Sequence, residues 1–370
     1  MEDISTVGMD IGKHLFQIHG ENKKGQVVLK QKTSRSGMME VFEKLPKGVL
    51  VGIESCSGAH FHARELRSLG HEVKLMPPQY VKKYVKTNKN DAADAEACCE
   101  GVTRPNMRFV EVKTEQQQSY AQLLCVRDRL VRNRTMVVNQ LHGFLLEFGV
   151  CVKKGVDKVI GDVIKALETY ESRLPMLTRQ LCRELVDELN ALNKLIDEKD
   201  KAIEAIAKNH EVCKNLLTIP GIGAVTALAM LTVVGDVTKF KTGRDFSAFL
   251  GLVPRQSSSA SKERLGGISK RGNPFVRKLL VQGAQALSAH AAKSTRPSAE
   301  WFVNLKKRRG HCKAIVAMAN KNARIVWAIL TRGEVYQADH KPNWNRKRKE
   351  GHAAATPVRG DNNRRPITIH

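Results

Sequence analysis

The first 110 residues alternate short strand-like apolar runs with two helix-like segments. Apolar residues at every second position predict strands, whereas apolar residues three or four positions apart predict helices. The predicted order is three strands, a helix, a strand, a helix and a last strand, after which Pro77–Pro78 begins a new segment. The predicted strands cover residues 6–11, 15–20, 26–31, 49–55 and 71–76, and the predicted helices cover 36–45 and 59–70.

Three successive leading strands, with acids on the first and fourth strands, are the pattern of an RNase H-like fold. Asp10 between Gly8 and Gly12 is also similar to the phosphate loop of sugar-kinase and actin-type ATPases. That fold requires a second phosphate loop and a second similar lobe, and neither is visible in the sequence. We therefore expect an α/β domain of the RNase H-like (RuvC-like) class over residues 1–112.

Residues 113–210 have a different pattern, in which charged residues fill the positions between regularly spaced apolar ones. This spacing predicts two long amphipathic helices that form an antiparallel coiled-coil arm. Arg127 and Arg134 lie beside the first apolar stripe, where they can grip a duplex backbone or simply face solvent. The apolar positions are Leu123, Val126, Leu130, Val137, Leu141 and Phe148, then Leu185, Leu189, Leu192, Ile196, Ile203 and Ile206.

Residues 211–332 predict a mostly helical domain that contains a helix–hairpin–helix. Glycines in the P-G-I-G turn at 220–223 expose backbone N–H groups to which a phosphate can bind, so Gly221 and Gly223 are candidate nucleic-acid contacts. A plain turn inside the core is the alternative. Residues 314–330 predict a buried helix, and the polar, basic tail over 333–370 is expected to be disordered.

The charge of the chain favours a polyanionic partner. It has 62 Lys and Arg against 37 Asp and Glu, a formal net charge of +25, and residues 251–310 alone hold 13 basic and 2 acidic side chains. Such a positive field attracts nucleic acid. No apolar stretch is long enough to span a bilayer and the start is unlike a signal peptide, so we expect a soluble, cytoplasmic protein without a membrane partner.

The eight cysteines include no C-x-x-C pair. Their scatter among apolar neighbours indicates buried, reduced thiols and not a zinc site, which would need closer grouping. His60 and His62 can ligate a metal, but we expect them on an exposed loop after Glu54.

Four carboxylates favour a shared metal site. Asp10 and Glu54 each follow a strand-like run, and Asp91 and Asp94 share one helix face because they are three residues apart. Carboxylates brought together raise each other's pKa unless a cation neutralises them. Oxygen ligands suit Mg²⁺ or Mn²⁺, and two such ions can clamp the attacking and leaving oxygens of a phosphate. The alternative is that each acid is merely solvated or caps a helix.

A later loop combines three consecutive serines, Ser257, Ser258 and Ser259, with basic residues. A serine hydroxyl becomes a nucleophile only when a base or metal activates it and positive groups stabilise the developing charge. Taken alone, the loop is more typical of a flexible phosphate-contacting segment. The basic residues that would position a DNA backbone are Arg255, Lys262, Arg264, Lys270 and Arg271.

Five motifs occur in order between residues 4 and 332: GMDIGK, GIES, KNDAADAEA, TIPGIGAVTA and LGLVPRQSSSASKERLGGISKRGNPFVRKLL. Together they resemble the DEDD-type transposases of the insertion sequence one-ten family, and the second half is most similar to its eleven-eleven subgroup. These transposases are relatives of the Piv site-specific invertases. The resemblance implies a RuvC-like domain, a coiled-coil arm, a C-terminal transposase domain, and DNA cleavage and strand exchange guided by a structured bridge RNA.

The resemblance also assigns site residues. Counting from Arg255–Gln256, it places the serine nucleophile on Ser259. The family serine normally precedes a glycine, but this chain has Ala260 there, which accepts positive φ less readily, so Ser258 is the second assignment. The metal-binding DEDD set falls on Asp10, Glu54, Asp91 and Asp94.

The metal cluster and the serine fall in different domains, so the resemblance implies composite sites between protomers of a homo-oligomer, either a dimer or a dimer of dimers. The expected partners are donor and target DNA and the bridge RNA, in the cytoplasm of a prokaryote in association with the nucleoid. Two hypotheses stay open beside this one. The first is a metal-dependent RuvC-like junction nuclease without covalent serine chemistry. The second is a non-enzymatic nucleic-acid-binding protein whose acids are structural.

Overall fold

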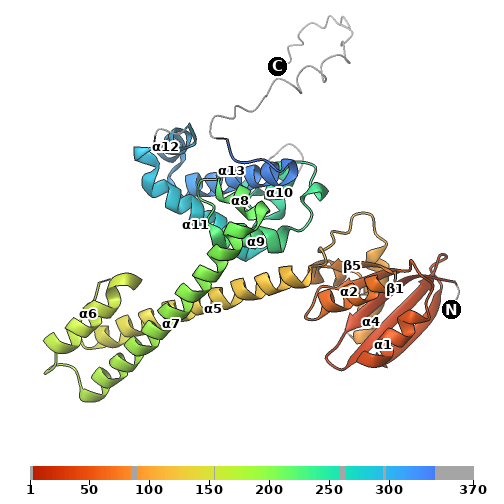
Figure 1. Cartoon of the computed structure of the whole chain (residues 1–370), viewed down its shortest axis with the longest axis horizontal. Coiled ribbons are helices and arrows are strands. Elements are labelled where there is room, and N and C mark those ends of the chain that lie inside the picture. The colour runs from red at the N-terminus through yellow and green to blue at the C-terminus, as the bar shows by residue number, and fades with distance from the viewer. Residues whose placement is uncertain (1–2, 86–89, 154, 258–263, 295–296, 338–370) are drawn as a thin grey trace, which may run out of the picture.

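The computed structural model describes residues 3–85, 90–153, 155–257, 264–294 and 297–337. The described chain forms a sheet domain, a pair of long helices and a helical C-terminal domain (Figure 1). Ser258, Ser259, Lys262 and most of the tail predicted to be disordered lie outside the described residues. Among the described helices, none combines the length and the apolar surface that a bilayer span requires.

The sheet domain is built on five strands in the order β3-β2-β1-β4-β5. The first three pair antiparallel, while β4 runs parallel to β1 and β5 parallel to β4. This topology confirms the predicted RNase H-like class, and each predicted strand is present. The strands are β1 (Ile4–Ile11), β2 (Leu15–Asn22), β3 (Val27–Ser34), β4 (Leu50–Glu54) and β5 (Glu72–Met76).

Helices cover both faces of this sheet. Alternate residues of the central strands, such as Val7 and Ile53, pack with Phe42 of α1 and Leu66 of α2 in one buried cluster. The opposite face carries Gly8, and α4 packs there against β1, β2 and β4. The helices are α1 (Arg35–Glu43), α2 (Ala59–Ser68), the short α3 (Pro78–Val81) and α4 (Asp91–Val102).

The arm consists of α5 (Glu115–Glu147), α6 (Val156–Thr169) and α7 (Met176–Asn209). The long helices α5 and α7 pack against each other, as the apolar spacing predicts. Leu141 and Leu189 are fully buried in the hydrophobic cluster of the arm. The helix α6 was not expected from the sequence. The sequence does contain the apolar spacing of a helix there, because Val163 and Leu167 are four residues apart and both are buried.

The start of the arm is fastened to α2. The backbone N–H of Lys113 donates to Nδ1 of His60 over 3.2 Å, and Nη1 of Arg64 donates to the carbonyl of Lys113 over 2.9 Å. Burial, with the nearby charges of Lys113 and Arg64, lowers the pKa of His60 to about 4. The prediction of an exposed loop for the two histidines is wrong, because both lie on α2 and His62 is buried.

The C-terminal domain is helical around one large core. Its last long helix confirms the buried segment predicted at 314–330, since Ile315, Ala319 and Val326 are buried. The elements are α8 (Glu211–Leu217), α9 (Ala224–Val234), η1 (Val237–Lys239), α10 (Gly243–Phe249), β6 (Pro254–Gln256), β7 (Leu265–Ile268), α11 (Pro274–His290), η2 (Ala291–Lys293), α12 (Pro297–Arg309) and α13 (His311–Arg332).

All eight cysteines belong to the described residues and are free thiols. The expectation that they are buried holds for half of them. Cys98, Cys99, Cys182 and Cys213 are buried, whereas Cys56, Cys125, Cys151 and Cys312 are exposed.

Candidate active site

The strand register brings the first two carboxylates together. Gly8 of β1 lies opposite Gly52 of β4 in the parallel pair. Asp10 and Glu54 each stand two residues further along their strands, so they leave the sheet on the same face as the two glycines. Two acids at the carboxyl ends of adjacent parallel strands are therefore neighbours, although 43 residues separate them in the sequence.

The two glycines allow α4 to lie directly on this face. A methyl group at Gly8 would be 2.0 Å from the carbonyl oxygen of Ala95, and one at Gly52 would be 2.6 Å from that of Cys98. Any larger residue would hold the helix away from the sheet. The close approach places the first turn of α4, which carries Asp91 and Asp94, over the ends of β1 and β4.

The side chain of Asn90 defines where this helix begins. Its Oδ1 accepts the backbone N–H of Ala93 over 2.7 Å, which is a standard N-cap. The cap sets the rotation of the first turn. The predicted helix is confirmed, and both Asp91 and Asp94 stand in its first turn. Their role as metal ligands stays a prediction.

The electrostatics show that the four acids act on one another. Burial, together with the charges of Asp91, Asp94 and Glu54, raises the pKa of Asp10 from 3.8 to about 6. Burial also raises the pKa of the Cys98 thiol, and the negative charges of Glu54 and Asp10 raise it further. Asp10 is thus the half-buried centre of a strongly negative site.

This donor set fits a hard divalent cation, because carboxylate oxygens are the ligands of Mg²⁺ and Mn²⁺ and the negative charge needs compensation. All four acids belong to the described residues, yet no three of them have carboxylate oxygens within 4.8 Å of one another. Closing around one ion therefore requires side-chain rotations. Asp91, which is exposed at the start of α4, has the most freedom to make such a rotation.

The raised pKa of Asp10 predicts how stability depends on pH. A carboxyl with a pKa near 6 when folded and 3.8 when unfolded binds its proton more tightly in the folded state. Its stabilising contribution is complete below pH 4 and disappears as the pH rises through 6. Without divalent cations, the free energy of unfolding should therefore fall between pH 4 and pH 7 more steeply in the wild type than in Asp10→Asn. Urea unfolding in EDTA measures this difference, and identical slopes for both proteins would contradict it.

A row of polar side chains extends from Asp10 towards the edge of the sheet. Asp10 is opposite Gln17 of β2, which is opposite Lys32 of β3, and the adjacent row continues from Gly8 through His19 to Lys30. Residues directly opposite each other share a face. A cavity of about 340 Å³ between these strands and the start of α4 is lined by both lysines and by Asn90. Positive charge thus lies beside the acidic site.

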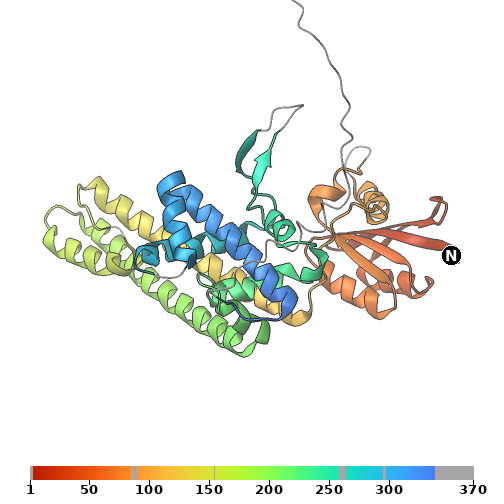
Figure 2. The same ribbon diagram turned by 90° about the horizontal axis from the view of Figure 1, so that it is seen from above.

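The strands β6 and β7, which flank the serine loop in the sequence, are exposed. Strands β6 and β7 pair antiparallel, and the N–H of Ser257 donates to the carbonyl of Arg264 over 2.9 Å where the hairpin narrows. Figure 2 shows the hairpin projecting from the helices of the C-terminal domain. Arg255, Arg264, Lys270 and Arg271 are exposed on or next to it.

Lys270, at the base of this hairpin, has an unusual backbone conformation. It adopts a φ of 54° and is the only described non-glycine residue with a positive φ. Its N–H donates to the carbonyl of Gly251 over 3.1 Å. This bond compensates for a conformation that most side chains avoid and closes the base of the hairpin.

Other predicted nucleic-acid contacts have structural partners. Arg127 forms a two-pronged ion pair with Asp200 of α7, and Nη1 of Arg134 approaches Oδ1 of Asn193 at 3.5 Å. Both arginines therefore hold the arm together, and their contact with DNA stays a prediction.

The turn between α8 and α9, where a helix–hairpin–helix was predicted, contains two glycines that differ in their surroundings. A methyl at Gly221 would be 2.9 Å from the carbonyl of Gly283, so Gly221 is needed for packing against α11. Gly223 is exposed with open space around it. A phosphate contact at this turn stays a prediction, and Gly223 is the better placed of the two.

Gly8 and Gly52 were not identified as site residues from the sequence. Their signal was available, since the motifs G-M-D and G-I-E place a glycine two residues before each strand-end acid. Glycines weaken strands, so two of them at equivalent positions indicate that another backbone approaches closely.

Two family profiles match the chain. Residues 7–149 match a DEDD-type IS110 family described as a transposase, and residues 213–299 match a family described as "Transposase IS116/IS110/IS902 family". The chain is 42% identical to a "Probable family 20 transposase" of Pseudomonas aeruginosa, over 90% of this chain and 99% of the relative. It is 42% identical to the transposase of insertion sequence element IS1328 of Yersinia enterocolitica (91% and 99%) and 40% identical to that of IS1111A of Coxiella burnetii (91% and 92%).

Proposed function

This chain belongs to the IS110 family of transposases, and we propose that it moves its insertion sequence by DNA cleavage and strand exchange at the DEDD carboxylates with a serine nucleophile and a bridge RNA guide. The observation that carries the proposal is the convergence of four carboxylates. The register of β1 and β4 makes Asp10 and Glu54 neighbours, and the first turn of α4 brings Asp91 and Asp94 close enough to act on Asp10. A non-enzymatic role does not explain why four negative charges converge despite their mutual electrostatic repulsion.

The four acids would hold the divalent cation, with Asp10 and Glu54 fixed by the sheet and Asp91 and Asp94 supplied by α4. A bound Mg²⁺ would polarise the scissile phosphate and favour ionisation of the attacking hydroxyl. Lys30 and Lys32 would contact neighbouring phosphates, because they lie on the face that leads to the acids. The site thus combines negative charge for the cation with positive charge for the DNA backbone.

Ser259 would attack the scissile phosphorus. A bond forms between its Oγ and phosphorus, the bond from phosphorus to the leaving deoxyribose oxygen breaks, and the serine proton is lost while the leaving oxygen gains one. The phosphoester energy is kept in the covalent intermediate, so strand joining needs no ATP. The exposed Arg255 and Arg264 would offset the charge that develops on the phosphate.

A composite site between protomers accounts for the separation of the two parts. The acids lie in the sheet domain, whereas β6 and β7, the strands that flank the serine loop in the sequence, project from a different domain (Figure 2). A homo-oligomer, as a dimer or a dimer of dimers, would bring the hairpin of one protomer to the acids of another and hold donor and target DNA together.

Ser259→Ala tests the nucleophile. With a DNA substrate that carries the element ends, the wild type should give a covalent protein–DNA adduct, whereas the alanine variant should give none because it lacks the attacking oxygen. Adducts are counted on denaturing gels after trapping. Ser257→Ala is the matched control and should retain adducts. Adducts that disappear only in Ser258→Ala would move the assignment to Ser258, and adducts that persist in both variants would favour a metal-dependent junction nuclease.

The guide RNA is tested by purification. The charge of +25 suits a second polyanion besides DNA, and we expect one discrete structured RNA to co-purify at a stoichiometry that survives moderate salt. Sequencing should map it to the non-coding flank of the same element in a bacterial host. A broad mixture of cellular RNA would contradict a specific guide.

A further inference from the structure

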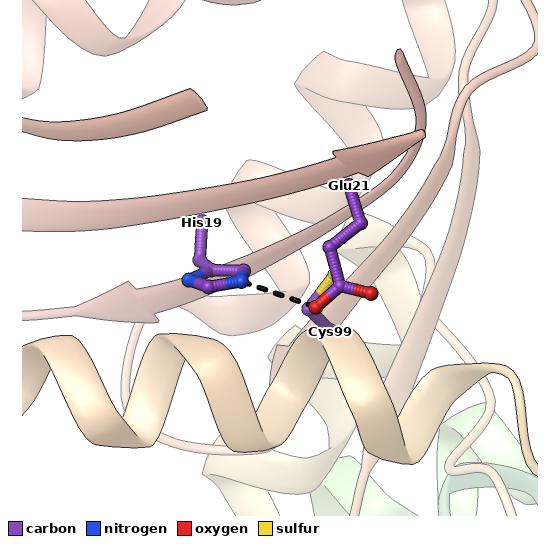
Figure 3. A group of neighbouring side chains, drawn as sticks. All are labelled: His19, Glu21 and Cys99. Carbon is purple, nitrogen blue, oxygen red and sulfur yellow. Dashed lines mark hydrogen bonds and ion pairs between the residues drawn. The ribbon is translucent and has the colours of Figure 1, made fainter. Parts of the chain in front are cut away.

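Three side chains with metal-ligand chemistry meet between β2 and α4, apart from the DEDD carboxylates. His19 and Glu21 come from β2 and Cys99 comes from α4, and all three point towards one another (Figure 3). One potential ligand atom of each lies within 4.8 Å of the other two, and Nε2 of His19 is 3.1 Å from Oε1 of Glu21. In the part of the chain that the structure describes, no other group of His, Cys, Asp and Glu residues meets this distance.

The sheet register explains why the cluster forms. His19 is opposite Gly8 and Glu21 is opposite Thr6, so both side chains leave the face that α4 covers. Because Gly8 has no side chain, the backbone of Cys99 comes close enough that a methyl at Gly8 would be 2.3 Å from its nitrogen. The Cys99 thiol is therefore pressed against the sheet and fully buried.

We propose that His19, Glu21 and Cys99 form a zinc site that is separate from the catalytic carboxylates. Thiolate sulfur, imidazole nitrogen and carboxylate oxygen are the three donor types that Zn²⁺ takes in proteins. One thiolate and one carboxylate supply two negative charges, which match a divalent ion. Mg²⁺ requires oxygen ligands and avoids sulfur, so the two sites select different ions.

The surroundings supply what three protein ligands lack. His19, unlike Glu21 and Cys99, lines the cavity of about 340 Å³ between β2, β3 and α4, so the ion and a water as its fourth ligand would enter from the side of His19. Binding would form a zinc–sulfur bond and release the thiol proton to solvent. Glu96 and Gln17 also line this cavity.

A zinc ion here would clamp α4 to the sheet. β2 and α4 would then share a metal in addition to their van der Waals contact, and α4 carries Asp91 and Asp94 in its first turn. The ion would therefore be structural and would position the catalytic helix. This site does not depend on the proposed recombination chemistry, because its ligands and its readout are different.

Cobalt substitution of the full-length protein tests the site. The protein is stripped with a chelator, Mg²⁺ is added in excess, and Co²⁺ is titrated while absorbance is recorded. We expect one Co²⁺ per chain with a thiolate-to-cobalt band in the near ultraviolet and visible d–d bands of a tetrahedral ion, all displaced by one equivalent of Zn²⁺. Cys99→Ser should lose the thiolate band, and His19→Gln should weaken Zn²⁺ binding about tenfold or more.

Neighbouring cysteines provide matched controls. Cys98→Ser removes the adjacent buried thiol of α4, and Cys56→Ser removes the exposed thiol that is close to Asp10 and Glu54. Both should keep the thiolate band. Absence of the band in the wild type, or its persistence in Cys99→Ser, would overturn the proposal. If Cys99→Ser does not fold by circular dichroism, His19→Gln and Glu21→Gln decide, and unchanged Zn²⁺ affinity in both would overturn it equally.

Discussion

Asp10→Asn should abolish DNA cleavage and leave the protein folded. The side chain is half-buried at the end of β1, and three other acids act on it, so it is the carboxylate that every other member of the set faces. Asparagine has nearly the same shape but no charge, and its amide nitrogen is not a metal ligand. We expect cleavage of a plasmid that carries the element ends to fall by about a thousandfold or more, as for the loss of a group that stabilises transition-state charge.

The same variant separates chemistry from folding. In EDTA at pH 7, Asp10→Asn should be more resistant to urea than the wild type, because it removes a half-buried charge and the repulsion from Asp91, Asp94 and Glu54. Asp187→Asn, an exposed acid on α7, is the control and should change neither cleavage nor stability. Cleavage by Asp10→Asn within tenfold of the wild type would mean that a different set of acids binds the cation.

Gly8→Ala should impair both stability and activity, although it adds only a methyl group. The new carbon would be 2.0 Å from the carbonyl oxygen of Ala95 and 2.3 Å from the nitrogen of Cys99. Both are backbone atoms of α4, which cannot rotate away as a side chain does, so the whole helix must move off the sheet. Overpacking of this kind costs about 1–3 kcal/mol of unfolding free energy.

Activity should suffer more than stability in Gly8→Ala. The shift of α4 moves Asp91 and Asp94 relative to Asp10, and misplacement of catalytic groups by about 1 Å can cost about a hundredfold in rate. Cleavage assays and urea unfolding measure the two effects separately, and Gly52→Ala should act in the same direction because its methyl would meet Cys98.

The control for this prediction is Gly143→Ala. Gly143 lies within α5 with nothing in reach of an added methyl, and alanine there should stabilise by about 0.5–1 kcal/mol because it favours a helix. If Gly8→Ala were as stable and active as Gly143→Ala, the close approach of α4 could not be what positions the acids.

Local patterns were sufficient to predict the five strands of the sheet, the helices α1 and α2, and the acids at the ends of β1 and β4. The alternation around Val7 and Ile53 shows which residues are buried, and the positions of Asp10 and Glu54 at strand ends follow from it. Apolar spacing likewise predicted the long helices of the arm. These features depend on a few neighbouring residues, and the linear order of the chain contains that information.

Distances between elements cannot be predicted in this way, because they depend on how backbones pack and not on periodicity. The cluster of His19, Glu21 and Cys99 exists only because α4 settles on Gly8, and no spacing in the chain indicates it. The sequence predicts that Arg127 can contact DNA, but in the structure Arg127 forms an ion pair with Asp200 on the facing helix. Sequence patterns specify which residues face a neighbour, whereas the fold specifies which neighbour that is and how near it comes.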